Sequence, residues 1–528
     1  MLERSKQKTR GITLVVLVIT IIILLVIAGV AIALVLGPNG IIIRAKEAKS
    51  NYESAKNKES NDLEKLEETI TGFNKEKKVN NPIVYEGMIP VKWDTNKSNW
   101  VVTTEEDNQW YEYGNQSENE KRWANVMLSD GKYKAETVEV GTEIEDTELG
   151  SMFVWIPRFA YKITNGYHGN GINKEGAGTI DVQFLVGETN QTIENELVEE
   201  KPKLNGDYET ATAMTNFVLH PSFSKDTEEG GWNHERKGFW AAKFEASSNQ
   251  TTEENPNIGT NGGGNEIGEQ KVQVKPNLNS WKGIDVVKAY TICKNMKLEN
   301  RYQLKNVEDT HLMKNSEWGA ISYLAKSHYG NIDKVWNNSY SDSSGNDVTK
   351  TGCSGENADD FTARDNVQVK KYNTYQEGTG PMASTTGTVY GIYDLAGGAW
   401  EMVSAFIEGA NNEYGEFYTN QVENRDKNIY QDAGQLNAYG NENYLANCLK
   451  IGDSIWETSY EVYSQANCAW ELDYSGSYPY VSKNTGYVTA PFFKRGGAYY
   501  EGTLEGIFAF RAHGGTGIAN LGFRPVIY

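Results

Sequence analysis

The feature that most constrains this chain is a long apolar run near its N-terminus. Residues Ile12 to Leu36 form a stretch of 25 residues that is interrupted only by Thr13, Thr20 and Gly29. An α-helix of this length spans about 37 Å at 1.5 Å per residue, which is enough to cross a bilayer. The run is also too long for the apolar core of a cleaved secretory signal peptide. The sequence therefore predicts a helix that spans the membrane.

Charge on the N-terminal side of this run predicts its orientation. The ten residues before Gly11 carry four cations and one acid. Because a positive flank stays in the cytoplasm, we expect the tail to lie inside and everything after Gly37 outside the cell. The prediction is a protein that is anchored in the membrane and exported to a bacterial cell surface or a pilus-like filament.

The order of a basic tail, Gly11 and a long apolar helix resembles the class III signal of type IV pilins and pseudopilins, over residues 1–72. The resemblance implies cleavage between Gly11 and Ile12 by a prepilin peptidase, and packing of the apolar helix among other pilin-like subunits. Pilins usually carry Glu at the fifth mature position, where this chain has Val16. Two alternatives follow, a minor subunit at a filament tip and an uncleaved membrane anchor.

Composition and periodicity divide the chain into six predicted segments. In the third segment Ala45, Ala48, Tyr52 and Ala55 recur at steps of three and four, which predicts an amphipathic helix. Its narrow apolar stripe fits either a solvated stalk or a helix covered by filament partners. The segments are a basic leader at 1–11, the apolar helix at 12–36, the amphipathic stalk at 37–72, a linker at 73–82, the N-terminal part of an exported head at 83–150, and the rest of the head at 151–528.

Short apolar stretches separated by tracts rich in Gly, Asn, Ser and Thr predict a head with many strands. The clearest of these stretches are residues 153–156, 159–163 and 238–244. Helical periodicity is clear only at Val286–Met296 and Ser316–Ala325. We therefore expect an α+β fold class with long polar insertions. Cys293 lies on the apolar face of the first helix and is predicted to be a packing residue.

Five short motifs occur in a fixed order along the head, at residues 238–245 (GFWAAKFE), 313–320 (MKNSEWGA), 390–401 (YGIYDLAGGAWE), 494–499 (KRGGAY) and 521–525 (LGFRP). Together they resemble the formylglycine-generating enzyme or sulfatase-modifying-factor domain, from about Met152 to Tyr528. The resemblance implies a C-type-lectin-like fold. It leaves residues 83–150 unexplained.

The same resemblance argues against the oxidase activity of that family. The oxidases carry two cysteines that bind copper, and the corresponding positions here hold Glu501 and Gly506. Cu(I) prefers soft thiolate ligands, so we expect no copper and no formylglycine chemistry. Members of the family often hold Ca²⁺ near an Asn that is Gly398 here, while Glu401 is retained. Glu401 is therefore a candidate calcium ligand, and no other cofactor is expected.

The motif around Trp400 also has a structural interpretation. Residues Gly391 to Leu395 predict a strand that enters a tight turn at Ala396 to Gly398. Trp400 is then expected to fill the core beneath that turn.

The C-terminal segment from Arg495 to Pro525 resembles that of ligand-binding proteins diversified by retroelements. The resemblance implies a rigid frame that displays variable side chains. The frame positions are Gly496, Gly497, Gly506, Ile507, Phe508, Phe510, Gly522, Phe523 and Arg524. The display positions are Ala498, Tyr499, Tyr500, Glu501, Thr503, Leu504, Arg511, His513, Thr516, Ile518 and Asn520. Tyr, Arg and His suit a binding surface because they combine area and polar groups with few torsions.

The net charge of −20 argues against a nucleic-acid partner bound through a basic surface. No zinc-protease, nucleophile-elbow, Walker A or dinucleotide motif is present, and the six histidines lack metal-ligand spacing. The leading hypothesis is a surface-displayed, non-catalytic adhesin or receptor for an extracellular protein or glycan. The alternatives are an enzyme that uses the fold for another reaction and a structural filament subunit.

Overall fold

The computed structural model divides into two compact units, Met1–Lys78 and Val79–Tyr528. We call the second unit the head. The described residues are 14–36, 49, 52, 56, 81–113, 121–167, 178–193, 195–207, 210–225, 231–251, 269–331, 347–349, 371–408, 410, 412–430, 451–458, 465–466, 476–477, 490–498, 506–518 and 520–528.

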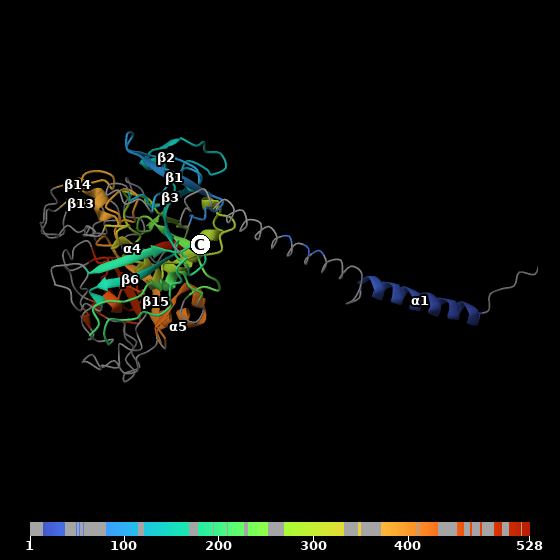
Figure 1. Ribbon diagram of the computed structural model, residues 1–528. Helices are drawn as coiled ribbons and strands as arrows, with labels where there is room; N and C mark the ends of the chain where they lie inside the picture. The colour runs from blue at the N-terminus through green and yellow to red at the C-terminus, as the bar shows by residue number, and fades with distance from the viewer. Residues whose placement is uncertain are drawn as a thin grey trace, which may run out of the picture. The chain divides into compact units, whose positions relative to one another are not determined.

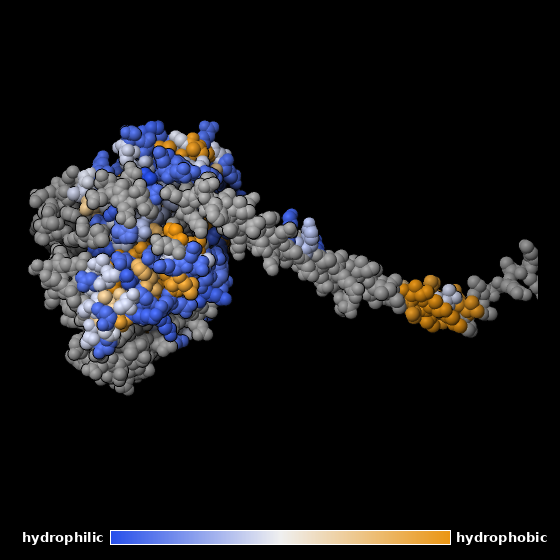
Figure 2. Space-filling view, in the orientation of Figure 1, coloured by the Kyte–Doolittle hydropathy of each residue, from blue (hydrophilic) through white to orange (hydrophobic). Residues whose placement is uncertain are grey.

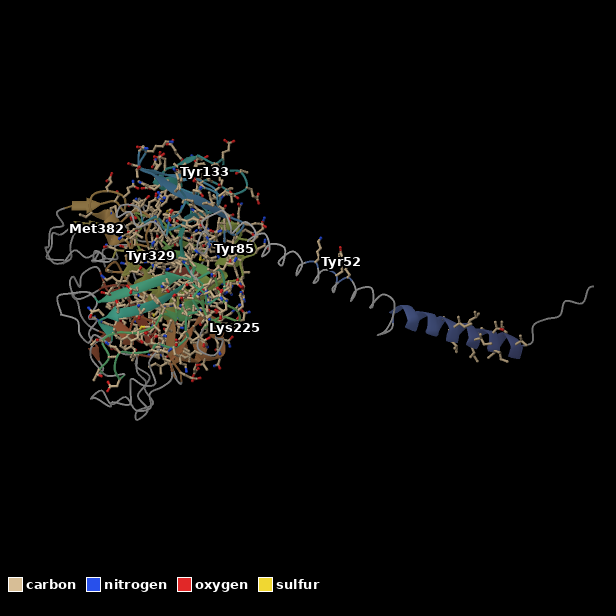
Figure 3. The ribbon with its side chains drawn as sticks, viewed as in Figure 1. Tyr52, Tyr85, Tyr133, Lys225, Tyr329 and Met382 are labelled. Atoms are coloured by element: carbon tan, nitrogen blue, oxygen red, sulfur yellow. The ribbon has the colours of Figure 1, made fainter. Side chains whose placement is uncertain are left out.

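The first unit contains the helix α1 (Leu14–Leu36), within which the described side chains are those of residues 16–28. Apart from Thr20, these side chains of the helix labelled α1 in Figure 1 are apolar, as Figure 2 shows, and Leu25 is 67% exposed. Within the described part of the chain no helix qualifies as a membrane span, and the span predicted at residues 12–36 stays a prediction. Tyr52 is also exposed (Figure 3). Gly11, Ile12 and most of residues 37–80 lie outside the described part, so the predictions for the leader, stalk and linker stay predictions.

An eight-stranded antiparallel sheet organises the head. The last strand of the chain lies inside this sheet, beside a strand that begins almost 290 residues earlier. Strands from residues 83–150 extend the sheet and pair with strands from 151–528, so both regions share one core. The strand order is β12 (Thr310–Leu312), β22 (Pro525–Ile527), β9 (Gly238–Ala242), β5 (Met152–Pro157), β3 (Asn125–Leu128), β1 (Met88–Asp94), β2 (Asn99–Val102) and β4 (Glu143–Ile144).

A second, mixed sheet of seven strands carries the C-terminal motifs. Its order is β16 (Asn428–Tyr430), β15 (Trp400–Ile407), β19 (Phe492–Arg495), β20 (Phe510–His513), β18 (Gly476–Ser477) and β17 (Gln465–Ala466), with β21 (Leu521–Phe523) paired to β15. The smaller sheets are β7 (Thr179–Phe184), β6 (Phe159–Asn165) and β8 (Val218–Leu219), then β10 (Ser247–Ser248) with β11 (Val272–Gln273), and β13 (Asp347–Thr349) with β14 (Lys371–Asn373).

Three α-helices are described in the head, and sequence reasoning predicted two of them. The helix α3 (Val286–Asn295) begins at Asp285, whose carboxylate accepts a hydrogen bond from the Lys288 backbone N at 2.9 Å. The helix α4 (Asn315–Ala325) is buried along its whole length. The third, α5 (Glu413–Asn420), was missed because it is short, polar and interrupted by a glycine. With mostly strands and few helices, the predicted α+β class is confirmed.

Short 3₁₀ helices complete the described secondary structure of the head. They are η1 (Asp146–Glu148), η3 (Pro221–Phe223), η4 (Met296–Leu298), η5 (Asn300–Tyr302), η7 (Gly380–Ala383), η8 (Asn424–Asp426) and η9 (Trp456–Thr458).

Most of the tryptophan side chains lie in the hydrophobic core. Nine of the 13 tryptophans in the chain are less than 2% exposed, Trp400 among them. Cys293 is 0% exposed within this core, which confirms it as a packing residue, and burial raises the pKa of its thiol well above the ordinary value. Figure 3 shows the side chains crowded between the strands of the head, and Figure 2 shows mostly hydrophilic residues on the visible described surface.

One predicted strand is wrong. Residues Gly391 to Leu395 form a single isolated bridge, between Ser384 and Tyr393, and no strand. Their backbone groups are instead taken by buried side chains, since Lys243 binds the carbonyl of Gly391 and Arg524 binds that of Tyr393. The predicted turn after them is present, with Gly397 and Gly398 at φ +82° and +70°.

Candidate functional site

The C-terminal motif forms a hairpin in the centre of the second sheet. β19 and β20 pair antiparallel, with Phe492 opposite His513 and Lys494 opposite Arg511. β19 also pairs with β15, where Arg495 lies opposite Glu401. This places two of the predicted display positions, Arg511 and His513, on β20, which β19 supports on one side.

The nine predicted frame positions are all buried. The three aromatic ones, Phe508, Phe510 and Phe523, are fully enclosed in the hydrophobic core. At Gly496, one of the frame glycines, a Cβ would lie 3.1 Å from the Leu395 carbonyl oxygen, and φ is +89°. The whole set is Gly496, Gly497, Gly506, Ile507, Phe508, Phe510, Gly522, Phe523 and Arg524.

Arg524 is the polar centre of the frame. Its Nε donates to Glu401 at 2.9 Å, and its Nη1 and Nη2 donate to the carbonyls of Ala242 and Tyr393, each at 2.9 Å. The guanidinium therefore joins β9 and β15 to the turn before β15. Both carboxylate oxygens of Glu401 accept from Arg524, which leaves them engaged as a bidentate ion pair rather than open to a calcium ion.

Glu245 limits the space at Gly398, the position where the resemblance to formylglycine-generating enzymes predicts asparagine. Its carboxylate accepts from the backbone N of Ala399 at 2.8 Å and from the hydroxyl of Ser280. A Cβ at Gly398 would lie 2.4 Å from Glu245 Oε1, in a backbone conformation with φ +70°. An asparagine side chain has no room there. Burial raises the pKa of Glu245, and Glu401 and Asp394 add to that effect.

Five display positions are accessible in the described structure. Thr516 is exposed, and Arg511, His513, Ile518 and Asn520 are half-buried. We call these five residues the C-terminal face. Ala498 is 0% exposed and belongs to the hydrophobic core, so its assignment as a display position is corrected to a frame position. Tyr499, Tyr500, Glu501, Thr503 and Leu504 lie outside the described residues.

Backbone hydrogen bonds hold the loop that carries the C-terminal face. The carbonyl of Gly515 accepts from Val286 N at 2.9 Å, and that of Ile518 accepts from Gly283 N at 3.1 Å. The carbonyl of Asn520 accepts from Trp400 N at 2.9 Å. The loop is therefore fixed by its main chain, and its side chains are left to determine the surface.

Trp400 and Lys494 lie beneath the face and were not predicted as part of it. The Lys494 Nζ is 4.3 Å and the Arg511 Cζ 5.1 Å from the centroid of the Trp400 ring, which is the geometry of cation–π contacts. Burial, together with Lys494, lowers the pKa of His513 to about 4. Its imidazole is neutral at pH 7 and serves as a hydrogen-bonding group rather than a charge.

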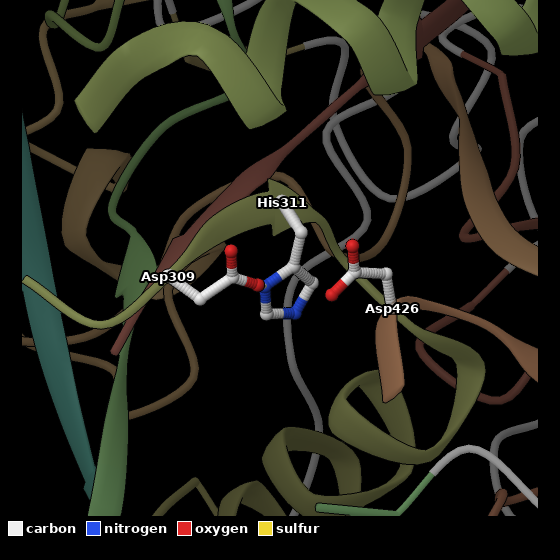
Figure 4. A group of neighbouring side chains, drawn as sticks. All are labelled: Asp309, His311 and Asp426. Atoms are coloured by element: carbon white, nitrogen blue, oxygen red, sulfur yellow. The ribbon is translucent and has the colours of Figure 1, made fainter. Parts of the chain in front are cut away.

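A separate group of acids and a histidine has the spacing of metal ligands. Ligand atoms of Asp309, His311 and Asp426 lie within 4.8 Å of one another, and all three residues are buried. Figure 4 shows the two carboxylates on opposite sides of the His311 ring. No other such group of His, Cys, Asp and Glu occurs among the described residues, and Glu401 belongs to none.

The charges of this group are already balanced by protein. The Lys294 Nζ lies 2.6 Å from Asp309 and 2.5 Å from Asp426, in the place that a cation would need. Burial lowers the pKa of His311, but Glu317 and Asp309 outweigh it and raise the pKa above its ordinary value. We therefore interpret the group as a structural ion network. It joins α3, β12 and η8, and no sequence spacing could have found it.

A cavity of about 90 Å³ lies between β11 and α3, where the enzyme alternative would need catalytic groups. It is lined in part by Thr291, Asn295 and Tyr302. Lys271 and Glu299, its charged groups, pair with each other at 2.6 Å. No nucleophile with an adjacent base lines this cavity, so its geometry supports no reaction.

Comparison with known proteins found one weak structural similarity and no matching family. No family model matches the chain, and no curated protein matches it. Among solved structures the chain is similar to Treponema denticola variable protein 1, with 13% identity, 62% of this chain and 92% of that chain covered, and a TM-score of 0.24. A similarity of this size carries no argument about fold or function. The resemblances to pilins, to formylglycine-generating enzymes and to diversified ligand-binding proteins stay predictions.

Proposed function

We propose that the chain is a non-catalytic ligand-binding protein, an adhesin or receptor that is displayed at the cell surface. Its head is a C-type-lectin-like frame, and the ligand is an extracellular protein or glycan. The apolar helix at 12–36 anchors it in the membrane or in a pilus-like filament. The C-terminal face binds the ligand, and no cofactor takes part.

One observation carries this proposal. Every predicted frame position is buried, whereas every described display position except Ala498 is accessible to solvent. Buried and accessible positions are divided within one hairpin and loop. A surface specialised for recognition requires this division, because the accessible side chains can contact a ligand while the buried ones maintain the core. Arg511 lies over the Trp400 ring, and His513 Nδ1 accepts a hydrogen bond from the Gly515 backbone N at 3.1 Å, so both polar groups are held in place.

The test uses the full-length chain in detergent micelles on glycan arrays and arrays of cell-surface proteins. Two variants are compared with the unmodified chain. The first carries Arg511→Ala, His513→Ala and Thr516→Ala on the face. The second carries Leu197→Ala and Lys203→Ala, which remove two exposed side chains on another segment.

Binding that disappears in the first variant and persists in the second is the expected result, provided that thermal unfolding shows both variants to be folded at the temperature of the assay. Equal binding by all three proteins contradicts the assignment of the face. Fractionation of cells should recover the chain with membranes or surface filaments, and recovery in the cytosol contradicts the proposed display.

A further inference from the structure

A buried carboxylate lies on the segment Gly452–Thr458, apart from the residues of the C-terminal face. Glu457 is 2% exposed. Its carboxylate accepts hydrogen bonds from the hydroxyls of Tyr161 and Tyr323, both at 2.8 Å, and from the backbone N of Gly452 at 2.7 Å. Tyr161 belongs to β6 and Tyr323 to α4. One side chain therefore ties the segment to two elements of the core.

No cation pairs with Glu457 among the described residues. The aromatic groups around it are Tyr161, Tyr323 and His220, whose ring centroid lies 5.4 Å from that of Tyr161. Burial lowers the pKa of His220 to about 3, so this imidazole is neutral at physiological pH. Within the described part of the head, Asp453, on the same segment, and Tyr167 also act on the titration of these side chains.

This environment makes the carboxyl of Glu457 sensitive to pH near neutrality. Burial is the largest cause, and it raises the pKa of Glu457 from 4.5 to about 7. The hydrogen bonds from Gly452, Tyr161 and Tyr323 favour the charged form and limit that rise, while Asp453 adds to it.

The same segment is bound by Arg495, which directly precedes the glycines of the frame. Its guanidinium is fully buried, and Nη1 donates to the Asp453 carbonyl at 2.9 Å. Nη2 donates to the hydroxyl of Ser454 at 2.6 Å, and Nε donates to the carbonyl of Ala509 at 3.0 Å. Arg495 thus links the segment to β19 and to Ala509, the residue before β20. The strand β20 carries Arg511 and His513 of the C-terminal face.

We propose that the segment Gly452–Thr458 is a proton-sensitive support for the C-terminal face, with Glu457 as its positioning residue and Arg495 as the link. With a proton on Glu457, the segment packs against β6 and α4 without burying a charge. Without that proton, the closed segment holds a carboxylate that has no cation beside it, and opening lets water solvate the charge. The contacts of Arg495 at Asp453 and Ser454 are then lost. Only the effect of these lost contacts on ligand binding by the C-terminal face rests on the proposed function.

Between the two pKa values the closed segment holds one proton more than the open one. Its stability is therefore greatest below about pH 4.5, falls as the pH rises toward 7, and is constant above that range. The equilibrium constant for opening is expected to grow by roughly one to two orders of magnitude between pH 5 and pH 8.

Hydrogen–deuterium exchange of the full-length chain tests this directly. Rates for peptides that cover Gly452–Thr458 are measured from pH 5 to pH 8 and corrected for intrinsic exchange. We expect protection to fall as the pH rises. Glu457→Gln keeps the shape but cannot titrate, so the dependence should vanish. Tyr323→Phe removes a donor to the charged form and should move the midpoint to higher pH. His234→Gln, which removes an exposed imidazole elsewhere, should leave the profile unchanged.

Protection that does not vary with pH overturns the proposal, and so does a variation that persists in Glu457→Gln. Binding to the arrays described above is measured at pH 5.5 and pH 8 in parallel. A segment that opens with pH while binding stays constant contradicts the link through Arg495. Absence of binding at both pH values contradicts the proposed function instead, and the exchange result then decides whether Glu457 titrates as inferred.

Discussion

Two buried groups of acids in the head are stabilised in opposite ways. Asp309 and Asp426 share the ammonium group of Lys294, whereas Glu457 has only hydroxyl and amide donors. Burial alone raises the pKa of both Asp309 and Glu457. At Asp309 the charges of His311 and Lys294 outweigh burial and hold the pKa well below its ordinary value, while that of Glu457 stays near 7. Internal cations therefore keep Asp309 charged, whereas burial and the charge of Asp309 still raise the pKa of Asp426, which shares the same ammonium group.

The largest effect is expected when that cation is removed. Lys294→Met leaves Asp309 and Asp426 buried and facing each other, so we expect the free energy of unfolding to fall by about 3–5 kcal/mol. The variant should also bring the titration of the pair into the range of Glu457. Denaturant unfolding between pH 5 and pH 8 measures both effects.

Lys297→Met is the matched control for this variant. Lys297 lies 3.4 Å from the same Asp309 oxygen, is 25% exposed, and is a second cation rather than the shared one. We expect its loss to cost about 1 kcal/mol or less. Equal losses for the two variants would mean that total charge, and not the bridging position of Lys294, holds the group together.

The next test concerns the packing of the Glu457 segment against Gly319 on α4. A Cβ at Gly319 would lie 1.9 Å from the carbonyl oxygen of Gly452. Gly319→Ala should push the segment that carries Glu457 away from α4 and cost about 1–3 kcal/mol. Gly522→Ala, whose Cβ would meet no atom closer than 3.5 Å, should cost less. Thermal unfolding of the two variants compares them, and a smaller loss for Gly319→Ala would show that the segment yields without strain.

His311 sharpens the comparison through pH. Its raised pKa means that the stability it contributes is fully present below its ordinary value of 6.5 and is lost as the pH rises through the folded value. We expect His311→Gln to lose about 1–3 kcal/mol at pH 5.5, where the imidazolium bonds to Asp309 and Glu317, and less at pH 9. Unfolding curves at the two pH values test this. A loss that grows with pH contradicts a charged His311.

Local patterns predicted much of the head, because they depend on neighbours in sequence. The periodicity of α3 and α4, the burial of Cys293 and the buried position of Trp400 follow from spacing and residue type alone. The strand predicted at 391–395 failed because Lys243 and Arg524, distant in sequence, take its backbone carbonyls.

The residues that decide titration could not be predicted in this way. Lys294 and Asp426 are 132 residues apart, and Tyr161 and Glu457 are 296 residues apart. A single sequence shows no signal for such pairs, since each member is an ordinary polar residue in its own segment. Only a family resemblance indicated how the C-terminal motif divides into frame and face. That resemblance did not predict the contact of Lys494 with the Trp400 ring.

The smallest effect on stability is expected on the face itself, where the charge of Arg511 is held by an aromatic ring and half exposed. Arg511→Met keeps most of the packing over Trp400 and removes the cation, so we expect a loss of about 0.5–1 kcal/mol. Lys494 still lies 4.3 Å from the ring centroid. Thermal unfolding followed by tryptophan fluorescence measures the change. A loss above about 2 kcal/mol would place Arg511 among the frame residues, and the face would then be smaller than the accessible positions indicate.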